Sequence, residues 1–542
     1  MTDIEIPYEK DRKGHYRFFE ILPGALSWGM VILTIVISFL NIELMVVLLL
    51  TYLIIFFVRS LGYDIRAIDG YITMKRHIKI NWDQLNEDLE SGIVDFTNKE
   101  RPKWHANNMA RRLSFDKIYK PSEVVHVAMI ATVNESEQVL RPTIESVKNS
   151  THGAKNIILV IAYEGRAGKV AQDRVEALIK EYKKDFKDAL CFQHPSDIPG
   201  EIIGKGGNIT YAGRQLEKYL KEKNIDSENV LVSTLDADNR PDKKYFSALT
   251  YMFCVVPNPI RCSFQPLPMF TNNIWDAPTM MRVIATGNNL YYIVQSKRAH
   301  LQRNFSAHAQ SMKSLVEMDF WSVRTVVEDG HQFWRSYFRY DGDYRVYPLS
   351  IPIYQDAVLA DTYFRTIRAQ FIQLRRWSYG ASDVAYIASK GFFHKNNIPL
   401  ADKLSKFLRT LEGHVTWAVG IYLVFGAVFL PHFFHPQNFA ANQLPITVSY
   451  IQRVGLVGAL ASVYICLVTL PKRPDRIKRR HSVIMLFQWV LAPFTGFLFG
   501  SLAAFNSQTR LMFKRYLSKF DVTEKAVRLS NKKIVSTKSD PY

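Results

Sequence analysis

Two aspartates one residue apart are the clearest candidates for metal chemistry in this sequence. Asp236 and Asp238 follow directly after residues 230–235, an apolar run with the character of a buried strand. Carboxylates at the point where a strand opens into a loop can hold a hard divalent cation together with phosphate oxygens. Such a cation would neutralise negative charge on a leaving phosphate group. The pair also fits an ordinary aspartate-rich turn, because Asn239 and Pro241 follow.

A second acidic pair could supply a general base. Glu328 and Asp329 follow the apolar stretch 320–327 and precede a predicted helix at 330–340. An aspartate in that position can remove a proton from a hydroxyl group. Carboxylates at the start of a helix are also common as caps that suit the helix dipole, so the pair alone leaves both roles open.

A third polar group combines an arginine with a tryptophan. Gln373, Arg376 and Trp377 lie in a helix that is predicted to begin near residue 360. The forked guanidinium of Arg376 could bind a diphosphate, and Trp377 offers a flat face on which a sugar ring can stack. The alternative is an amphipathic helix whose arginines snorkel beside a membrane.

A glycine-rich turn at 203–208 contains Lys205 and Asn208 and precedes another predicted helix. Backbone N–H groups and a lysine at a helix start can meet phosphate. The turn is not a Walker loop, because the spacing and the terminal Lys-Ser/Thr are missing. On its own it is a weak signal.

The elements around these residues alternate between strands and helices. Strands are predicted at 124–132, 156–162 and 230–235, and helices at 137–148, 169–184 and 207–223. The alternation predicts an α/β fold with a mostly parallel sheet and helices on both faces. Ligands of such sheets bind beyond the carboxyl ends of the strands, which is where Asn134, Glu135, Glu164 and Asp236 fall.

Apolar segments of membrane length flank this middle region. Residues 24–40 and 44–58 predict a transmembrane hairpin over 23–60, since a helix of the first length spans about 25 Å of a hydrocarbon layer of about 30 Å. One bent buried helix or a signal peptide are the alternatives, and the long mixed-charge start at 1–22 argues against the second. Three more candidate spans lie at 415–434, 454–470 and 483–505.

Positive charge predicts the orientation of these segments. The loop at 471–480 is rich in lysine and arginine and is expected in the cytosol. Residues 431–450 contain no lysine or arginine and are expected outside. The middle of the chain then lies in the cytosol of a multi-pass cell-membrane protein. A single span at 483–505 would send the basic tail outside, so we expect a broken or re-entrant hairpin around 493–500.

The formal charge of +19 over 542 residues needs no nucleic acid as a partner. Basic loops beside a bilayer attract anionic head groups at about 1 kcal/mol per charge. We therefore expect the lipid bilayer, and no nucleic acid, as the partner of these charges. The four cysteines show no metal-ligand spacing and are expected to be reduced.

Taken together and in this order, the motifs resemble the inverting, membrane-integrated family-2 glycosyltransferases of the cellulose, hyaluronan and chitin synthase type. The resemblance covers residues 120–400 by motif and the flanking segments by layout. It implies a Rossmann-like glycosyltransferase A domain that moves a hexose from a nucleotide-diphosphate sugar to a growing polysaccharide, with Mg²⁺ or Mn²⁺. Subunits of an assembly complex are further partners that it implies.

The resemblance divides the chain into seven parts. These are a cytosolic tail at 1–22, the transmembrane hairpin at 23–60, a membrane-proximal linker at 61–120, the catalytic domain at 121–395, an interfacial helix at 396–411, C-terminal membrane helices at 412–513 and a basic cytosolic tail at 514–542.

The resemblance also implies the roles of single residues. Asp236 and Asp238 match the metal ligands, Asp329 the catalytic base of a Thr-Glu-Asp motif, and Trp377 the acceptor entry of a Gln-x-x-Arg-Trp motif. The implied donor-binding residues are Asn134, Glu135, Glu164, Lys205, Asn208, Asp236, Gln373 and Arg376.

The sequence departs from that family at three places. Glu164 stands where an aspartate usually holds the nucleotide base, Val327 replaces the threonine of Thr-Glu-Asp, and no Phe-x-Cys-Gly-Ser/Thr acceptor motif is recognisable at 310–324. Two alternatives therefore stay open. One is a non-processive transferase that adds one sugar to a polyprenyl phosphate or lipid, and the other is a non-catalytic membrane regulator that binds nucleotide sugars.

Overall fold

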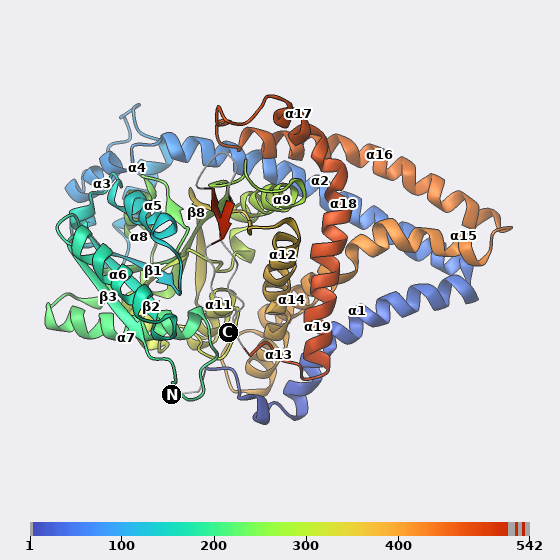
Figure 1. The fold of residues 1–542 in the computed structure, drawn as a ribbon, viewed down its shortest axis with the longest axis horizontal. Coiled ribbons are helices and arrows are strands. Elements are labelled where there is room, and N and C mark those ends of the chain that lie inside the picture. Colours follow the sequence, from blue (N-terminus) through green and yellow to red (C-terminus); the bar gives the residue numbers. More distant parts are fainter. Residues whose placement is uncertain (1–3, 519–525, 529–533, 537–542) are drawn as a thin grey trace.

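The computed structural model describes residues 4–518, 526–528 and 534–536, and it has an α/β core from which long helices extend to one side (Figure 1). The core sheet has eight strands in the order β3-β2-β1-β4-β7-β6-β8-β5. The α/β fold class is confirmed.

Four parallel strands form one half of this sheet. They are β1 (Val125–Thr132), β2 (Ile157–Glu164), β3 (Asp188–His194) and β4 (Val230–Asp236). β1, β2 and β4 are short apolar runs rich in β-branched residues and almost wholly buried, as expected of strands that are covered on both faces. Parallel pairing brings their carboxyl ends to one edge.

The other half of the sheet is mixed. β7 (Ala309–Ser311) pairs antiparallel with both β4 and β6 (Cys262–Phe270), β8 (Arg345–Gln355) runs parallel to β6, and β5 (Arg240–Pro241) is antiparallel to β8. The expectation of a mostly parallel sheet thus holds for the first half only.

Helices cover both faces of the sheet because alternate residues of each strand point in opposite directions. In β1, Ala128 and Ile130 pack against α5 (Glu137–Lys148), α6 (Lys169–Tyr182) and α8 (Tyr245–Val255). Val127 and Met129 face α7 (Lys205–Glu222) and α10 (Met312–Glu317). α3 (Trp82–Ser91) and α4 (Lys103–Arg112), which lie in the predicted linker, join the first layer.

Four helices are long and apolar enough to cross a membrane. They are α1 (Gly14–Leu40), α2 (Ile42–Lys79), the run Leu400–Phe434 from α14 (Leu400–Ile421) to α15 (Leu430–Phe434), and the run Arg480–Met512. The bent helix α16 (Phe439–Val468) is a fifth candidate. Large apolar side chains such as Ile32, Val47 and Ile54 stay exposed along them, as expected of surfaces that contact lipid.

The expected re-entrant hairpin around 493–500 is wrong. α17 (Arg480–Phe487), α18 (Ala492–Thr495) and α19 (Leu502–Met512) follow one another as a single helical run. This run lies across the direction of α1, α2 and α16 (Figure 1). The predicted interfacial helix at 396–411 forms the first turns of α14, which begins at Leu400 and continues into a candidate span.

Candidate active site

One cavity of about 1230 Å³ collects most of the predicted site residues. It lies beyond the carboxyl ends of β1, β2 and β4 and reaches α11 (Glu328–Arg339) and α12 (Tyr363–Ser378). The predicted residues that line it are Glu135, Glu164, Lys205, Asn208, Asp236, Asp238, Asp329, Gln373, Arg376 and Trp377. Asn134 is half-buried and is not among the lining residues.

Lys205 joins two of the predicted motifs at the first residue of α7. Its ammonium group lies 2.9 Å from Asp236 Oδ1, 3.3 Å from Asp329 Oδ1 and 3.9 Å from Glu328 Oε1. Burial alone would lower the pKa of Lys205, but the three carboxylates outweigh it and raise the pKa above its ordinary value. Lys205 therefore carries a positive charge at the centre of the site.

The glycine at the second residue of α7 is explained by a close approach. A Cβ added to Gly206 would lie 2.3 Å from the carbonyl oxygen of Ser322. Since that oxygen belongs to backbone, only glycine lets the start of α7 pack here and present Lys205 to the carboxylates.

Glu328 and Asp329 occupy different environments. The Glu328 side chain is 1% exposed, and burial, with the neighbouring Asp329 charge, raises its pKa to about 8. The Asp329 side chain is 18% exposed and lines the cavity. Burial thus favours the protonated form of Glu328, and Asp329 is the carboxyl group that faces the open space.

A neutral histidine lies beside Asp329. His308 Nδ1 is 3.9 Å from Asp329 Oδ1 and 3.0 Å from the Phe305 carbonyl oxygen, while His308 Nε2 accepts a hydrogen bond from Trp321 Nε1 at 3.3 Å. These partners assign the ring proton to Nδ1. Burial lowers the pKa of His308, in agreement with a neutral ring.

The two aspartates after β4 are held by neighbours that the sequence did not reveal. Ser306 Oγ donates to Asp236 Oδ2 at 2.6 Å, and the backbone N–H of Asp356 donates to Asp238 Oδ2 at 3.0 Å. Asp356 also lines the cavity. Neither Ser306 nor Asp356 lies in a recognisable motif, so only the fold brings them here.

The carboxylate oxygens of Asp236 and Asp238 fit a divalent cation that binds together with a phosphate-bearing ligand. Within the described residues, no three His, Cys, Asp or Glu side chains are grouped to hold a metal ion. Mg²⁺ usually takes one or two carboxylates, with water and substrate phosphate oxygens completing its shell. Asp236 and Asp238 are hard oxygen donors that line the cavity, so the site suits Mg²⁺ or Mn²⁺ bound together with a diphosphate.

The ends of β1 and β2 form a second wall of the cavity. Asn208 Nδ2 donates to the carbonyl oxygens of Thr132 (3.3 Å) and Ala162 (3.0 Å), and thereby ties the two strand ends together. Glu164 lies 3.2 Å from His194 Nδ1. Burial opposes a charge on His194, but Glu164 and Glu201 raise its pKa to about 9.

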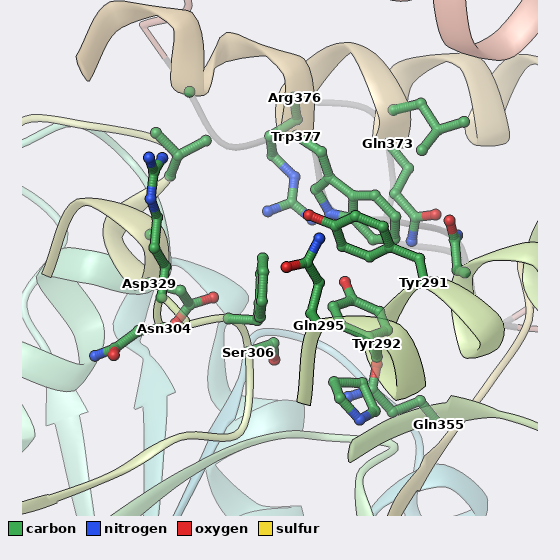
Figure 2. Close-up of a pocket in the computed structure, with 18 of the residues that line it drawn as sticks. Tyr291, Tyr292, Gln295, Asn304, Ser306, Asp329, Gln355, Gln373, Arg376 and Trp377 are labelled. Atoms are coloured by element: carbon green, nitrogen blue, oxygen red, sulfur yellow. The ribbon is translucent and has the colours of Figure 1, made fainter. Parts of the chain in front are cut away.

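The helix α12 covers the cavity. Gln373, Arg376 and Trp377 point from it toward Tyr291 and Tyr292 of α9 (Thr279–Ser296), and Asp329 faces them across the open space (Figure 2). Trp377 packs on Phe270 at the end of β6, with ring centroids 6.0 Å apart. The positive charge of Arg376 opposes the rise in the pKa of Glu328.

The far end of the same cavity is basic, which the sequence motifs did not indicate. Its lining arginines and lysine are Arg59, Arg298, Arg303, Lys406 and Arg409. They come from α2, the segment after α9, and α14. No short motif links residues so far apart in the chain.

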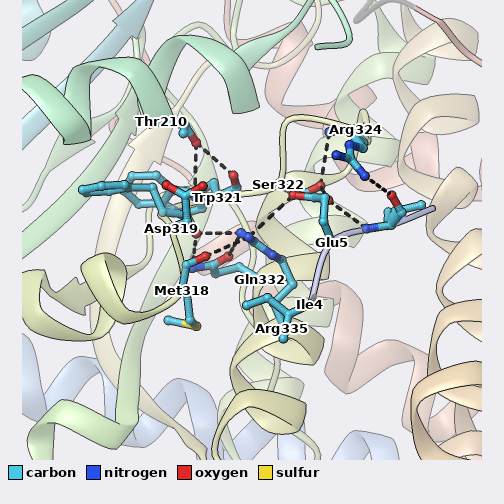
Figure 3. A network of polar contacts seen from close by, with 12 residues as sticks. Ile4, Glu5, Thr210, Met318, Asp319, Trp321, Ser322, Arg324, Gln332 and Arg335 are labelled. Carbon is cyan, nitrogen blue, oxygen red and sulfur yellow. Dashed lines mark hydrogen bonds and ion pairs between the residues drawn. The ribbon is translucent and has the colours of Figure 1, made fainter. Parts of the chain in front are cut away.

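The N-terminal segment braces the loop that precedes Asp329. Glu5 accepts a hydrogen bond from Ser322 Oγ and lies 3.5 Å from Arg335 Nη2 (Figure 3). Arg335 in turn donates to the carbonyl oxygens of Phe320 (2.6 Å) and Met318 (2.8 Å). Phe320 has a φ of +62°, a conformation that a bulky residue adopts only when its surroundings hold it there.

No protein-family model and no curated protein matches this sequence. Among solved structures, similar chains include a mannosyltransferase from Pyrobaculum calidifontis in complex with GDP-Man and Mn²⁺, at 11% identity and a TM-score of 0.36 over 80% of this chain and 99% of that one. Residues 1–349 of S. aureus TarS in complex with UDP-GlcNAc match at 10% identity and a TM-score of 0.36, over 66% and 95% of the two chains. GalNAc-T7 with UDP, GalNAc and Mn²⁺ matches at 11% identity and a TM-score of 0.28, over 56% and 58%. Scores of this size carry no weight for function, which has to be inferred from the geometry of this chain.

Proposed function

We propose that this protein is a membrane-bound, inverting glycosyltransferase of the family-2 type. It would move a hexose from a nucleotide-diphosphate sugar to an acceptor, with a glycosyltransferase A domain in the cytosol. One observation carries the proposal: a single cavity unites the Asp236–Asp238 carboxylates, Lys205, Asp329 and the Arg376-Trp377 pair. These are the groups that such a transfer needs, drawn from distant parts of the chain.

The donor would bind with its diphosphate between the end of β4 and α12. Lys205 and Arg376 supply positive charge on two sides of that space. A Mg²⁺ or Mn²⁺ ion held by Asp236 and Asp238 would neutralise charge on the departing diphosphate. The nucleoside would lie toward Glu135 and Glu164 at the ends of β1 and β2.

The transfer step uses Asp329 as the general base. Its carboxylate takes the proton from the acceptor hydroxyl, and the acceptor oxygen attacks the anomeric carbon opposite the diphosphate. A new bond forms between that oxygen and the anomeric carbon. The bond between the anomeric carbon and the diphosphate oxygen breaks, and the nucleoside diphosphate leaves with the electron pair. The single displacement inverts the anomeric configuration.

The acceptor distinguishes two versions of this function. In the first, the acceptor is a growing polysaccharide that leaves between the helices at 23–60 and 411–513. In the second, one sugar is added to a polyprenyl phosphate or lipid. The basic far end of the cavity favours this second version. A non-catalytic regulator would bind the donor and release nothing.

A screen of the purified full-length protein against nucleotide sugars tests the proposal. We expect one donor to give nucleoside diphosphate and an elongated acceptor, with the product length read by mass spectrometry. A single added sugar would select the lipid version. Donor binding without any release of nucleoside diphosphate would contradict the enzyme and leave the regulator.

Removal of one carboxylate tests the metal site without reference to turnover. In wild-type protein, Mn²⁺ should strengthen the binding of a nucleoside diphosphate in calorimetric titrations. Asp238→Ala should lose most of that dependence because it removes a hard oxygen donor. The exposed Asp173→Ala is the matched control and should keep it. Equal nucleotide affinity in EDTA and in Mn²⁺ for wild-type protein would contradict the cation site.

A further inference from the structure

The basic far end of the cavity is not used by the transfer step described above. Its five lining cations are Arg59 on α2, Arg298 and Arg303 after α9, and Lys406 and Arg409 on α14. They share one continuous space with the donor site. A second charged ligand, or a charged part of the acceptor, can therefore lie there while the donor is bound.

Three of these cations lack a carboxylate partner. Arg59 pairs with Glu412 at 2.6 Å and Lys406 with Asp402 at 2.5 Å. Across the described part of the chain, no carboxylate lies within 4.0 Å of Arg298, Arg303 or Arg409. The cluster thus holds an excess of positive charge.

Contacts hold these like charges close together. Arg303 donates to Thr410 Oγ1 at 2.7 Å and stacks over the Trp334 ring, with its guanidinium carbon 4.6 Å from the ring centroid. Burial lowers the pKa of Arg298, and repulsion from Arg66, Arg409 and Arg59 adds to the effect. An anion bound between these groups would relieve the repulsion.

The cluster lies at the boundary of the apolar helix segments. Arg59 comes directly after the apolar stretch 44–58 of α2, and Glu412 comes shortly before the apolar stretch 415–434. Their ion pair fixes α2 and α14 at the same level. In a bilayer, residues at the end of the apolar stretch lie at the depth of the lipid phosphates.

Aromatic side chains line the cavity that holds both this cluster and Asp329. Tyr291 and Tyr292 of α9 face Trp377 of α12, and Trp417 of α14 lines the same cavity (Figure 2). Flat aromatic faces suit sugar rings. The cavity thus holds the base, aromatic faces and the arginines together.

We propose that the basic end binds the phosphate or diphosphate group of a lipid-linked saccharide, which is the acceptor. Its lipid chain would stay in the bilayer, its phosphate would contact Arg298, Arg303 and Arg409, and its terminal sugar would reach Asp329. The transfer step is the one given above: the sugar hydroxyl loses its proton to Asp329, and the lipid phosphate is unchanged. The inference rests on the proposed function and names its acceptor class.

The test measures binding to the full-length protein in detergent. The probes are farnesyl diphosphate, farnesol and inorganic diphosphate. We expect farnesyl diphosphate to bind, and the Arg298→Gln/Arg409→Gln double variant to bind it at least about tenfold more weakly, because two charged contacts are lost. The control Lys478→Gln removes an exposed charge from the basic loop at 471–480, outside the cavity, and should bind like wild type.

Each probe has an outcome that overturns the inference. If farnesol binds as tightly as farnesyl diphosphate, the site recognises the chain and not the phosphate. If inorganic diphosphate binds as tightly, the source is free phosphate and not a lipid. If binding of farnesyl diphosphate is the same in the double variant, the arginines do not hold it.

A second readout separates misfolding and failure of the proposed function from failure of this inference. The double variant should melt at the same temperature as wild type or higher, since it removes repulsion, and should bind nucleoside diphosphate normally. Donor turnover with a lipid-diphosphate-linked saccharide acceptor, unaffected by the double substitution, would uphold the transferase and overturn the lipid-phosphate site. Arginine-dependent binding of farnesyl diphosphate without donor turnover would uphold the lipid-phosphate site and overturn the transferase.

Discussion

Glu328 and Asp329 are adjacent in sequence, yet their side chains differ in burial. The Glu328 side chain is 1% exposed with a pKa of about 8, whereas the Asp329 side chain is 18% exposed and faces the cavity. Neighbouring carboxyl groups in different environments commonly take different roles. Here the buried member limits negative charge beside Lys205, and the exposed member is available as a base.

Replacement of Asp329 by asparagine should abolish most transfer. The amide keeps the size and the contacts of the side chain but cannot accept the proton, so we expect a loss of roughly 100- to 10,000-fold in the transfer rate. Affinity for the nucleotide sugar should stay close to wild type. The control is Asp319→Asn, an exposed carboxylate that pairs with Arg214. Steady-state release of nucleoside diphosphate measures both variants, and full turnover of Asp329→Asn would refute the assignment.

The pKa of Glu328 predicts a pH dependence of stability. An unfolded chain loses this proton near pH 4.5, whereas the folded protein keeps it up to about pH 8. Because the folded state binds the extra proton, the stability contributed by this group decreases as the pH rises through that window.

Glu328→Gln should flatten this part of the stability profile. The variant mimics the protonated side chain at every pH, so its melting temperature should fall less than that of wild type between about pH 4.5 and 8. Thermal unfolding in detergent across this range measures the difference. Glu222→Gln, on the exposed end of α7, serves as the control with the wild-type slope. Parallel profiles for wild type and Glu328→Gln would show that Glu328 is already ionised in the folded state.

Among the elements, the N-terminal segment acts as a brace for the loop that leads into α11. Glu5 connects to Ser322 and Arg335, and Arg335 holds the carbonyl oxygens of Met318 and Phe320 (Figure 3). The loop holds two successive residues with positive φ, Asp319 (+51°) and Phe320 (+62°). Such backbone is kept in place only by its surroundings.

Glu5→Ala should destabilise this loop and lower transfer together with stability. It leaves the buried Arg335 without its carboxylate, at an expected cost of about 1–3 kcal/mol in the free energy of unfolding. Glu9→Ala, at an exposed position in the same segment, is the matched control. Chemical denaturation and transfer rates measure both effects. An unchanged midpoint for Glu5→Ala would mean that the segment does not brace the loop.

The elements with local patterns were predictable, and those defined by long-range pairing were not. The strand β1 and the helix α5 were predicted to within one residue, because apolar spacing in a short window is sufficient. β7 has only three residues and owes its place to pairing with β4 and β6. The same contrast separates Asp329, which belongs to a motif, from Ser306 and Asp356, which reach the cavity only through the fold.

For the whole molecule, the run Arg480–Met512 explains a conflict in the charge pattern. Its first part contacts α9, where Arg282 Nε donates to Gln488 Oε1 at 3.1 Å. Its last turn contacts the beginning of α1, where Arg17 Nη1 donates to the Leu511 carbonyl oxygen at 2.6 Å. Since α9 belongs to the sheet domain and the start of α1 is expected on the same side, we infer that this run lies along the inner membrane surface. Lys514 and Arg515, which follow it, then stay inside without a re-entrant hairpin.

Cysteine labelling tests this arrangement. Ser518→Cys, in the exposed segment after α19, should react with a membrane-impermeant maleimide only from the cytosolic side, in inverted vesicles. Gln437→Cys, in the exposed turn between α15 and α16, should react only from the outside. Labelling of Ser518→Cys in intact cells would mean that Arg480–Met512 crosses the membrane.

The turns at the outer end of the helices have a consequence for biosynthesis. Only Asn41 separates α1 from α2, and only residues 435–438 separate α15 from α16. The two turns lie together, since His435 Nε2 is 3.0 Å from the Phe39 carbonyl oxygen. In the proposed topology, these five residues are all that lies between the described helices on the outer side, and none of them is an acid, a lysine or an arginine. Each helix pair can therefore enter the bilayer as a closed hairpin, without the translocation of any hydrophilic segment.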